Sequence, residues 1–472
     1  MGLDVKTKIK TISENFDLIN TIRRCHTSDK KLLAKALDIS WPTLNTSLKN
    51  ILDDSSGPII QNDMGEYDVD KSYGFFLGIA VGGTETKVSI IDFSLNPIGD
   101  ESDFFPEYKN IKYTLSRIKN YKKQEKDDVL ACYYTPEFPQ EISNMCSDIL
   151  NEVVSFFEKS DLCDLLGVGI TFPGVFGNTN SEENVFRMGF CPNLSRLVGI
   201  SLIDLFDKRI IEKIKTNNIS FVISHDTEAV TVFEKESLYN CSNKDYAYRD
   251  KSNVACVYLG IGLGMGLIIN NELLHGSCNS VGEIGHLFTP IMTLNDDQLN
   301  EKELKEKIEM AKRREEILRR KPHCYCGIDN CLENKLRVEV FNALDQTEYI
   351  DNTTTKELNE FCNNHPYRYR ILKNYISYLM NLIINLLNVD MIIFAGRIFN
   401  EIDALKFDID RIKITSGLTT SASACKVTFG SGRIDAVAAG GAILSFFNYK
   451  DKRTDCTVDK KMTTKWNRVY FN

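Results

Sequence analysis

The sequence has no run approaching the roughly 18 consecutive apolar residues that a membrane-spanning helix needs. Its first residues, MGLDVKTKIKTISENF, lack the apolar segment of a secretory signal peptide. The chain also lacks an excess of positive charge, with a formal net charge of -8 and a pI near 5.5. This balance excludes a protein that is basic throughout, although DNA binding depends on the charge of the contacting face alone. We expect a cytoplasmic protein without a membrane segment.

At 472 residues the chain is too long for one compact core, so two or three folding units are expected. In the cytosol its 14 cysteines favour small core residues or metal ligands over disulfides. Most of them, such as Cys25, Cys146 and Cys256, stand alone in predicted helices or strands, where burial is the simplest interpretation.

Residues 13–52 have the pattern of three helices with a sharp internal turn. Ser13 can cap the first helix, and Ser28 or Asp29 can cap the second. Ser40 follows the turn and can cap the third helix. Two short strand-like segments then surround a turn before residue 72. Helix, helix, turn, helix and hairpin is the order of a winged helix.

From about residue 74 apolar strands alternate with helical segments, which favours an α/β body built from two related halves. The strand-rich stretches are 74–93, 165–172, 219–224, 254–269 and 390–395, and the helical segments are about 140–159, 228–238 and 369–387. The apolar residues of 101–131 show neither a helical nor a strand period. Residues 292–321 are charged and helix-prone, and we expect a solvated helix there.

These patterns divide the chain into a head, two lobes and a tail. We predict a winged helix-turn-helix domain at 1–72, a first α/β lobe at 73–225, a second lobe at 226–450 with a charged helical insertion at 291–322, and a C-terminal tail at 451–472.

A cysteine cluster is the strongest local signal. Cys324, Cys326 and Cys331 lie within eight positions, and Gly327 supplies a turn that folds them together. Zinc suits such a cluster because it binds sulfur and nitrogen tetrahedrally without redox chemistry. We expect His286 as the fourth ligand and a structural Zn2+ site, with His323 as the nearer but less suitable histidine. Three buried structural thiols are the alternative.

Two glycine-rich turns follow apolar strands, at 82–84 and at 260–266. Glycines there let backbone N–H groups approach an anion closely. Each turn alone is weak evidence, because glycine-rich hairpins are common.

Together these motifs resemble the ROK family (repressors, uncharacterised frames and sugar kinases) across about residues 13–450. Six segments carry the resemblance in the family's order: GGTETK at 82–87, TFPG at 171–174, CPNL at 191–194, HDTEA at 225–229, GEIGH at 282–286 and CYCG with CLE at 324–333. The resemblance implies an actin-like or hexokinase-like body of two α/β lobes, with sugar and nucleotide meeting in the cleft, behind an N-terminal winged helix-turn-helix domain.

The resemblance also implies roles for individual residues. In a kinase of this family, Asp226 would be the base that takes a proton from a sugar hydroxyl. The implied sugar-binding residues are Asn193, His225, Asp226, Glu283, His286 and Glu333. His286 would both bind zinc and face the sugar, so that the metal orients the recognition loop. His225 and Glu228 stand where the family usually has asparagine, which leaves the identity of the sugar open.

The phosphate loops depart from the family pattern. Ala80 stands where active kinases have Asp, Ile261 replaces a hydroxyl, and the third glycine pair reads Gly396-Arg397. The implied nucleotide-binding residues, in degenerate form, are Gly82, Gly83, Thr84, Gly260, Gly262 and Gly396. Because phosphoryl transfer depends on positioning and charge neutralisation, these losses favour a sensor over a catalyst. ATP and Mg2+ are expected only if the chain is a kinase.

The predicted third helix can read DNA. Its outward residues are Thr43, Asn45, Thr46, Ser47 and Lys49, and such side chains reach base edges in a groove. Residues 1–50 contain nine Lys/Arg and five Asp/Glu, whereas residues 51–70 contain no Lys/Arg and six Asp/Glu. An acidic wing should not lie along phosphates, and the arginine-rich linker usual in the family's regulators is absent from 65–73. A vestigial or dimer-forming head is the alternative.

We therefore expect a homodimeric or homotetrameric transcriptional regulator, a repressor whose affinity for operator DNA changes when a sugar or sugar phosphate binds. The alternative is an ATP-dependent hexose or N-acylhexosamine kinase with Asp226 as catalytic base, which Ala80 and Ile261 oppose. A third class is a sugar-binding protein with neither activity.

Overall fold

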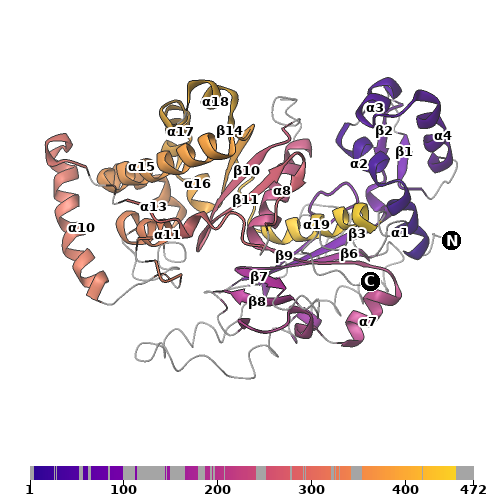
Figure 1. Cartoon of the computed structure of the whole chain (residues 1–472), viewed down its shortest axis with the longest axis horizontal. Coiled ribbons are helices and arrows are strands. Elements are labelled where there is room, and N and C mark those ends of the chain that lie inside the picture. The colour runs from indigo at the N-terminus through magenta and orange to yellow at the C-terminus, as the bar shows by residue number, and fades with distance from the viewer. Residues whose placement is uncertain are drawn as a thin grey trace. The chain divides into compact units, whose positions relative to one another are not determined.

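The computed structural model (Figure 1) describes residues 5–25, 27, 29–52, 57–61, 65–82, 86–98, 112–113, 144, 146–148, 165–178, 186–191, 194, 197–206, 208–240, 251–276, 279–290, 292, 294–319, 324, 326–328, 330–341, 353–416 and 418–452. The predictions for the remainder of 101–131 and 140–159, and for the tail after residue 452, lie outside these residues. Within them, no helix is long and apolar enough to cross a membrane.

The head begins with one helix more than the sequence predicted. Helix α1 (Val5–Glu14) buries Ile9 and Ile12, and helix α2 (Phe16–Cys25) follows after a single residue. Ser13 therefore lies inside a helix instead of capping one, so that prediction was wrong. The apolar side chains of the first helix were too few among lysines to reveal it in the sequence.

The rest of the head follows the predicted order. Its elements are α3 (Lys30–Ala36), α4 (Trp41–Leu52) and a hairpin of β1 (Ile59–Gln61) and β2 (Tyr67–Val69). The Asp29 carboxylate accepts from the first N–H groups of α3, and the Ser40 hydroxyl accepts from the N–H of Thr43 at 3.3 Å. Leu44 and Leu48 of α4 are buried as expected, which turns the polar side of this helix outward.

The chain forms two compact units, and their limits differ from the predicted lobes. The first unit contains 1–242, 277–279 and 435–472, and the second contains 243–276 and 280–434. The expected boundary at 225/226 therefore moves to 242/243, because helix α8 (Asp226–Asn240) packs on the first unit's sheet and on α19 (Ala436–Lys452). Helix α19 likewise returns to the first unit, which the sequence did not indicate.

The first unit has a five-stranded sheet in the order β5-β4-β3-β6-β9. Its strands are β3 (Phe75–Val81), β4 (Thr86–Ile91), β5 (Lys112–Tyr113), β6 (Leu165–Phe172) and β9 (Ser220–His225), accompanied by the hairpin β7 (Val175–Asn178) and β8 (Phe186–Phe190), helix α7 (Lys208–Thr216) and two 3₁₀ turns (Lys71–Tyr73 and Leu202–Leu205). Strands β3 and β4 are antiparallel, whereas β3, β6 and β9 are parallel. The carboxyl ends of β6 and β9 carry Phe172 and His225 side by side.

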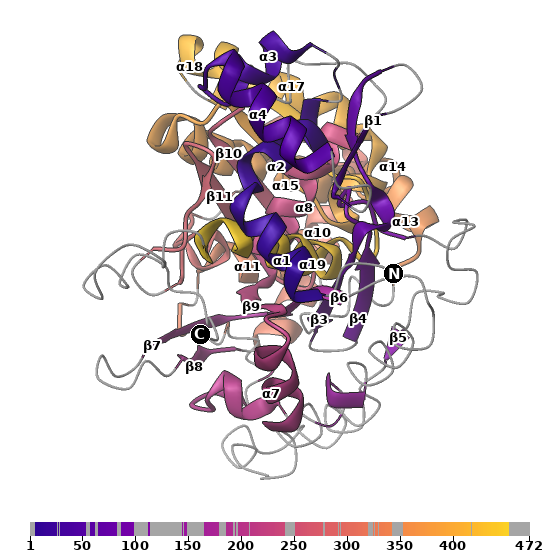
Figure 2. The same cartoon turned by 90° about the vertical axis from the view of Figure 1, so that its right-hand side faces the viewer.

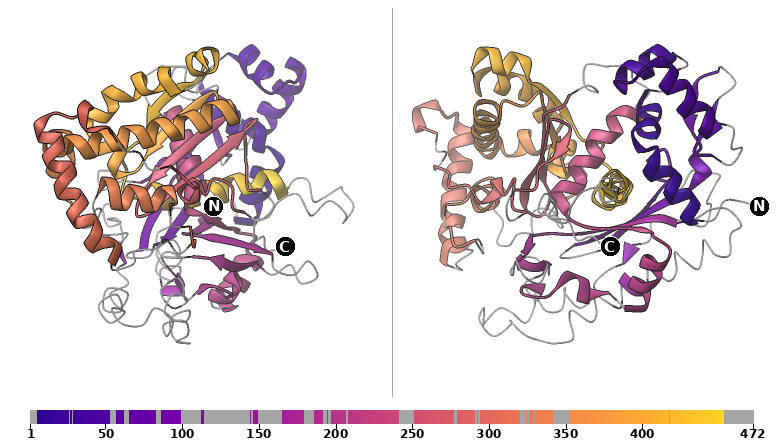
Figure 3. Two further views of the ribbon diagram at one scale, coloured as in Figure 1. Left: turned by 60° about the vertical axis from the view of Figure 1, so that its left-hand side comes forward. Right: turned by 45° about the vertical axis from the view of Figure 1, so that its right-hand side comes forward.

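Glycines let α19 lie unusually close to α8 and to the sheet. A Cβ at Gly440 would come within 1.9 Å of the Ala229 carbonyl oxygen, and one at Gly78 would meet the Ala438 oxygen at 1.7 Å. Figure 3 (right) shows α19 nearly end-on, with α8 on one side and the first helices of the head on the other. Figure 2 shows α1 and α2 passing over α19. The head is thus packed against the first lobe.

The second unit repeats the pairing pattern of the first. Its sheet has the order β12-β11-β10-β13-β14, in which β10 and β11 are antiparallel and β10, β13 and β14 are parallel. Its strands are β10 (Val254–Leu259), β11 (Leu263–Ile269), β12 (Glu272–Leu273), β13 (Met391–Ala395) and β14 (Lys426–Phe429). The α/β body of two related halves is therefore confirmed.

Helices and short turns surround this second sheet. They are η5 (Ile284–His286), η6 (Asp296–Gln298), α10 (Glu301–Arg319), α11 (Leu332–Lys335), the π-helical η7 (Leu336–Val340), α13 (Thr355–Asn359), α14 (Phe361–Asn364), α15 (Pro366–Leu382), the π-helical η8 (Ile383–Leu387), α16 (Arg397–Glu401), α17 (Asp403–Ser416) and α18 (Thr419–Ala424).

The charged insertion is docked, in part, instead of being a wholly solvated helix. At the start of α10, Glu303 is buried and accepts from Arg370 at 3.2 Å. One turn later, Glu306 accepts from Arg368 at 2.8 Å and from the N–H of Tyr367. The expectation of a solvated face was wrong for this first half, because its acidic residues pair with basic ones on α15.

Candidate functional site

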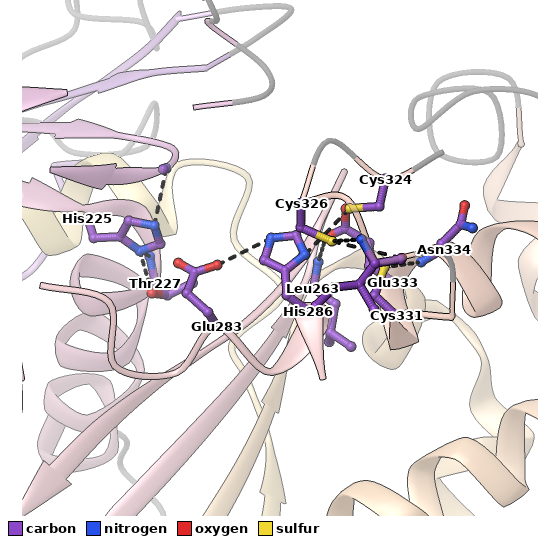
Figure 4. Close-up of polar contacts among 12 residues, drawn as sticks. His225, Thr227, Leu263, Glu283, His286, Cys324, Cys326, Cys331, Glu333 and Asn334 are labelled. Atoms are coloured by element: carbon purple, nitrogen blue, oxygen red, sulfur yellow. Dashed lines mark hydrogen bonds and ion pairs between the residues drawn. The ribbon is translucent and has the colours of Figure 1, made fainter. Parts of the chain in front are cut away.

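The predicted cysteine cluster and His286 come together in the second unit. One ligand atom from each of His286, Cys324, Cys326 and Cys331 lies within 4.8 Å of the others (Figure 4). The Cys324 Sγ atom is 3.5 Å from the His286 Nδ1 atom. His323 lies outside the described residues, so the structure brings only His286 into the cluster.

Short backbone contacts bring this histidine to cysteines that are about forty positions away in sequence. The segment after His286 runs beside the segment around Cys331: the N–H of Leu332 donates to the Leu287 oxygen at 2.9 Å, and that of Thr289 to the Asn330 oxygen at 3.0 Å. Gly327 has a φ of +77°, which favours glycine and turns the cysteine loop back.

One distance in this donor set can be compared with the geometry of a tetrahedral metal site. Zinc bonds of about 2.3 Å to sulfur and about 2.0 Å to nitrogen place tetrahedral S and N ligands about 3.5 Å apart. The observed Cys324–His286 separation matches that value. Cys324 and Cys331 are buried, and Cys326 and His286 are half-buried. The described residues therefore contain a cluster that can hold a metal ion.

The other side of His286 faces a carboxylate. Its Nε2 atom is 3.6 Å from the Glu283 Oε2 atom, on the side of the ring away from the sulfurs (Figure 4). Both side chains are positioned by η5, whose tight turn depends on Gly282. At Gly282 a Cβ would come within 1.6 Å of the Met265 oxygen. The GEIGH segment therefore fixes an imidazole and a carboxylate next to each other.

Glu333 closes the second glycine-rich loop. Its Oε2 atom accepts from the N–H of Leu263 at 2.8 Å, and the N–H of Gly260 donates to the Gly262 oxygen at 3.0 Å. A Cβ at Gly262 would lie 2.8 Å from the same Glu333 oxygen. Burial raises the pKa of Glu333, and the Leu263 N–H opposes that rise. Two amides of this loop, those of Gly260 and Leu263, are therefore hydrogen-bonded within the protein, and the second of them is bonded to a carboxylate.

The other predicted nucleotide glycines are only partly described. Gly82 follows β3, whereas Gly83 and Thr84 lie outside the described residues. Gly396 has a φ of +104°, and a Cβ there would come within 2.2 Å of the Leu259 oxygen. Close packing of two backbone segments is therefore enough to require glycine at this position, with or without a nucleotide.

The remaining sugar-binding predictions fall in the first unit, at the end of β9. The His225 Nε2 atom accepts from the N–H of Gly174 at 3.2 Å, and its Nδ1 atom lies 2.6 Å from the Thr227 hydroxyl. Asp226 begins α8, 3.2 Å from the His225 ring. Burial raises the pKa of Asp226, and His225 opposes that rise. Asn193 lies outside the described residues.

In the head, the outward face of α4 is accessible. Thr43, Thr46 and Lys49 are exposed, and Asn45 and Ser47 are half-buried. Asn45 accepts from Lys30 of α3 at 3.1 Å. Trp41, which the sequence reasoning passed over, begins α4 with 53% of its surface exposed. An apolar ring at the start of an otherwise polar face was the signal that could have identified it.

Comparison with known proteins agrees with this arrangement. The ROK family model matches residues 122–444. A candidate xylose repressor of Caldicellulosiruptor sp. (strain Rt8B.4) is 21% identical over 406 residues, which are 80% of this chain and 82% of the relative. The xylose repressor of Staphylococcus xylosus is 30% identical over 139 residues, which are 29% and 30% of the two chains.

A solved structure shares the fold along nearly the whole chain. It is a ROK family transcriptional regulator, a homologue of the E. coli MLC protein, with a TM-score of 0.54 and 15% identity over 93% of this chain and 98% of its own. Since the family model covers more than half of the residues, the chain belongs to the ROK family.

Proposed function

We propose that this protein is a sugar-responsive transcriptional repressor that binds operator DNA as a homodimer or homotetramer. The observation that carries the proposal is the accessible polar face of α4, held by a buried apolar side in a head of winged-helix order. The relatives named as xylose repressors support the same function. D-xylose is therefore the first effector to test.

Hydroxyl-binding roles are proposed for each unit separately, at the end of β9 in the first unit and in the GEIGH segment of the second. In the first unit Asp226 would supply a carboxylate. In the second, Glu283 and the Nε2 atom of His286, 3.6 Å apart, would bind one hydroxyl group together. His225 uses both ring nitrogens on Gly174 and Thr227 in this structure. We therefore assign His225 the role of orienting the Gly174 turn beside the sugar, and we assign Asn193 a contact with a sugar hydroxyl.

Zn2+ is the proposed occupant of the metal cluster. Three thiolates and one imidazole would complete its four positions, so no site is left for a reactive water. The ion would fix His286 and the cysteine loop and would take no part in a reaction.

DNA binding can be tested on the exposed face of α4. We expect Lys49→Ala to weaken binding to DNA from the protein's own promoter and to reduce the slope of log affinity against log salt by about 1, because one phosphate contact is lost. Fluorescence anisotropy at several salt concentrations measures both. Lys10→Ala is the control, since Lys10 is 75% exposed on α1 and, among the described residues, forms an ion pair with Glu14 of the same helix. Equal losses in the two variants would contradict a role for α4.

A sugar kinase is the second candidate, favoured by the retained Asp226 with its raised pKa. We expect no sugar-dependent ATP turnover, because Ala80 removes a carboxylate and Glu333 occupies the Leu263 amide in the second loop. A coupled assay with D-xylose, D-glucose and N-acetylglucosamine measures turnover. Turnover that Asp226→Asn abolishes would establish the kinase and overturn the repressor assignment.

A further inference from the structure

Helix α8 is buried on all sides, although its sequence is not apolar. Every residue from Thr227 to Glu236 is buried, including Glu234, Lys235 and Glu236. Helices buried all round are normally apolar all round. Charged side chains in the interior must therefore be paired, and their partners identify what the helix contacts.

The partners of Glu236 belong to the head. Arg23 of α2 is fully buried and donates to the Glu236 Oε2 atom at 2.5 Å, and Arg24 donates to the Oε1 atom at 2.5 Å. Burial alone would raise the pKa of Glu236, but Arg24 and Arg23 outweigh it and hold the pKa at about 2. One carboxylate is thus shared by two guanidinium groups from the same helix.

Aromatic rings surround this cluster, which we call the Glu236 triad (Arg23, Arg24 and Glu236). The Arg24 guanidinium lies 4.7 Å from the Tyr239 ring centroid of α8, and the Arg23 guanidinium lies 6.0 Å from that of Phe446 on α19. Two nitrogens of Arg23, Nε and Nη1, are buried without a hydrogen-bond partner in the part of the chain that the structure describes. Arg23 and Glu236 are therefore shielded from water, Arg24 is half-buried, and the hydrogen-bonding capacity of Arg23 is only partly satisfied.

Such a buried charged cluster adds little to the stability of the fold. Replacing a buried ion pair by apolar side chains is often neutral or stabilising, because desolvation of the charges offsets their attraction. Its attested use is to select one arrangement of two elements over others. Two arginines on one carboxylate fix both the distance and the rotation between α2 and α8.

The opposite end of α8 is the proposed sugar site. Asp226 is the first residue of the helix, and Glu236 follows ten positions later, about 15 Å along the axis at 1.5 Å per residue. Between these two ends, the absence of a side chain at Gly440 lets α19 pack closely against α8 at Ala229. Helices in switching proteins commonly shift by about 1–2 Å. A shift of that size in α8 would move both Asp226 and Glu236.

We propose that α8 and the Glu236 triad couple the sugar site to the DNA-binding head, with Glu236 as the positioning residue. Sugar at Asp226 biases the position of α8, and the triad converts that bias into a change in the orientation of α2 and of the helices that follow it. The inference rests on the proposed function and names the route of its regulation.

The test measures coupling, which a merely structural role would leave unchanged. Full-length Arg23→Met/Arg24→Met/Glu236→Met replaces the whole triad by apolar side chains of similar length. Arg24→Met alone leaves one buried arginine for one glutamate and serves if the triple variant does not fold. Lys373→Met is the control, because its ion pair with Asp408 at 3.0 Å lies in the second unit.

Two readouts are taken with and without D-xylose, D-glucose or N-acetylglucosamine: affinity for promoter DNA by anisotropy, and hydrogen exchange of the head amides in α2 to α4. We expect sugar to change the DNA affinity of the wild type and of Lys373→Met by a factor within the 5–150-fold usual for allosteric coupling. In the triple variant the factor should fall to within twofold of 1, and in Arg24→Met to an intermediate value. Sugar affinity itself should change little in any variant.

The outcomes separate this inference from the proposed function. A folded triple variant that keeps the wild-type factor would overturn the triad route and leave the repressor intact. Other contacts of the head, such as that between the Phe16 and Phe446 rings at 5.0 Å, would then be considered for the coupling. If the wild-type protein binds no DNA, the proposed repressor function is wrong. Hydrogen exchange of the head amides then still tests whether sugar binding is coupled to the head. Head amides that respond to sugar in the wild type and not in the triple variant support it. Head amides that no sugar affects in the wild type overturn it.

Discussion

Replacing Glu236 with alanine should lower the free energy of unfolding by about 3–5 kcal/mol, because it leaves the fully buried Arg23 and the half-buried Arg24 without a counter-charge. The loss comes from the unpaired guanidinium groups, since Arg23 is fully buried and has no route to water. Urea denaturation followed by circular dichroism measures the change. This is the largest stability effect that we expect from a single substitution in the head or in α8.

Two comparisons show whether charge is the cause. Glu14→Ala removes a glutamate that is 60% exposed on α1 and should change stability by no more than about 0.5 kcal/mol. The triple methionine variant of the Glu236 triad should be far more stable than Glu236→Ala, because no charge stays buried alone. If the triple variant loses as much stability as the single one, packing and not unpaired charge explains the effect.

Loss of one cysteine from the metal cluster should remove the metal and weaken sugar binding together. We expect purified wild-type protein to contain about one zinc per chain and Cys326→Ser to contain almost none after dialysis against a chelator, since a structural zinc needs all four ligands. Sugar affinity should fall about tenfold or more, because His286 loses the partner that fixes its ring. Elemental analysis and isothermal titration calorimetry measure the two quantities.

Cys326 suits this test because its side chain is half-buried. Within its own loop, its sulfur accepts a hydrogen bond from the N–H of Ile328 at 3.4 Å, and this contact is local. Cys331 would be a poorer choice, since its sulfur also accepts from the N–H of Asn334 at the start of α11. Cys362→Ser, outside the cluster, is the control and should keep both zinc and sugar affinity. Full sugar affinity in zinc-free protein would contradict the coupling of metal and sugar.

Local patterns were sufficient wherever the governing interactions lie within one turn or one strand. The α4 cap at Ser40, the buried Leu44 and Leu48, and the strand at 165–172 could be predicted because their energetics depend on neighbours a few residues away. The cysteine loop could be predicted for the same reason, since three sulfurs within eight positions can meet around a single turn. The first helix of the head was missed, because its stability comes from packing on α19 instead of from its own residues.

The sequence by itself therefore determined the order of domains, the three clustered sulfurs and the outward face of α4. Only the tertiary structure decided that Glu333 closes the loop at Leu263, 70 positions away, and that Arg23 pairs with Glu236, 213 positions away. The physical reason is that a charged side chain in a helix looks the same in sequence whether it faces water or a partner. Burial and pairing are set by the contacts of distant segments, which no local spacing records.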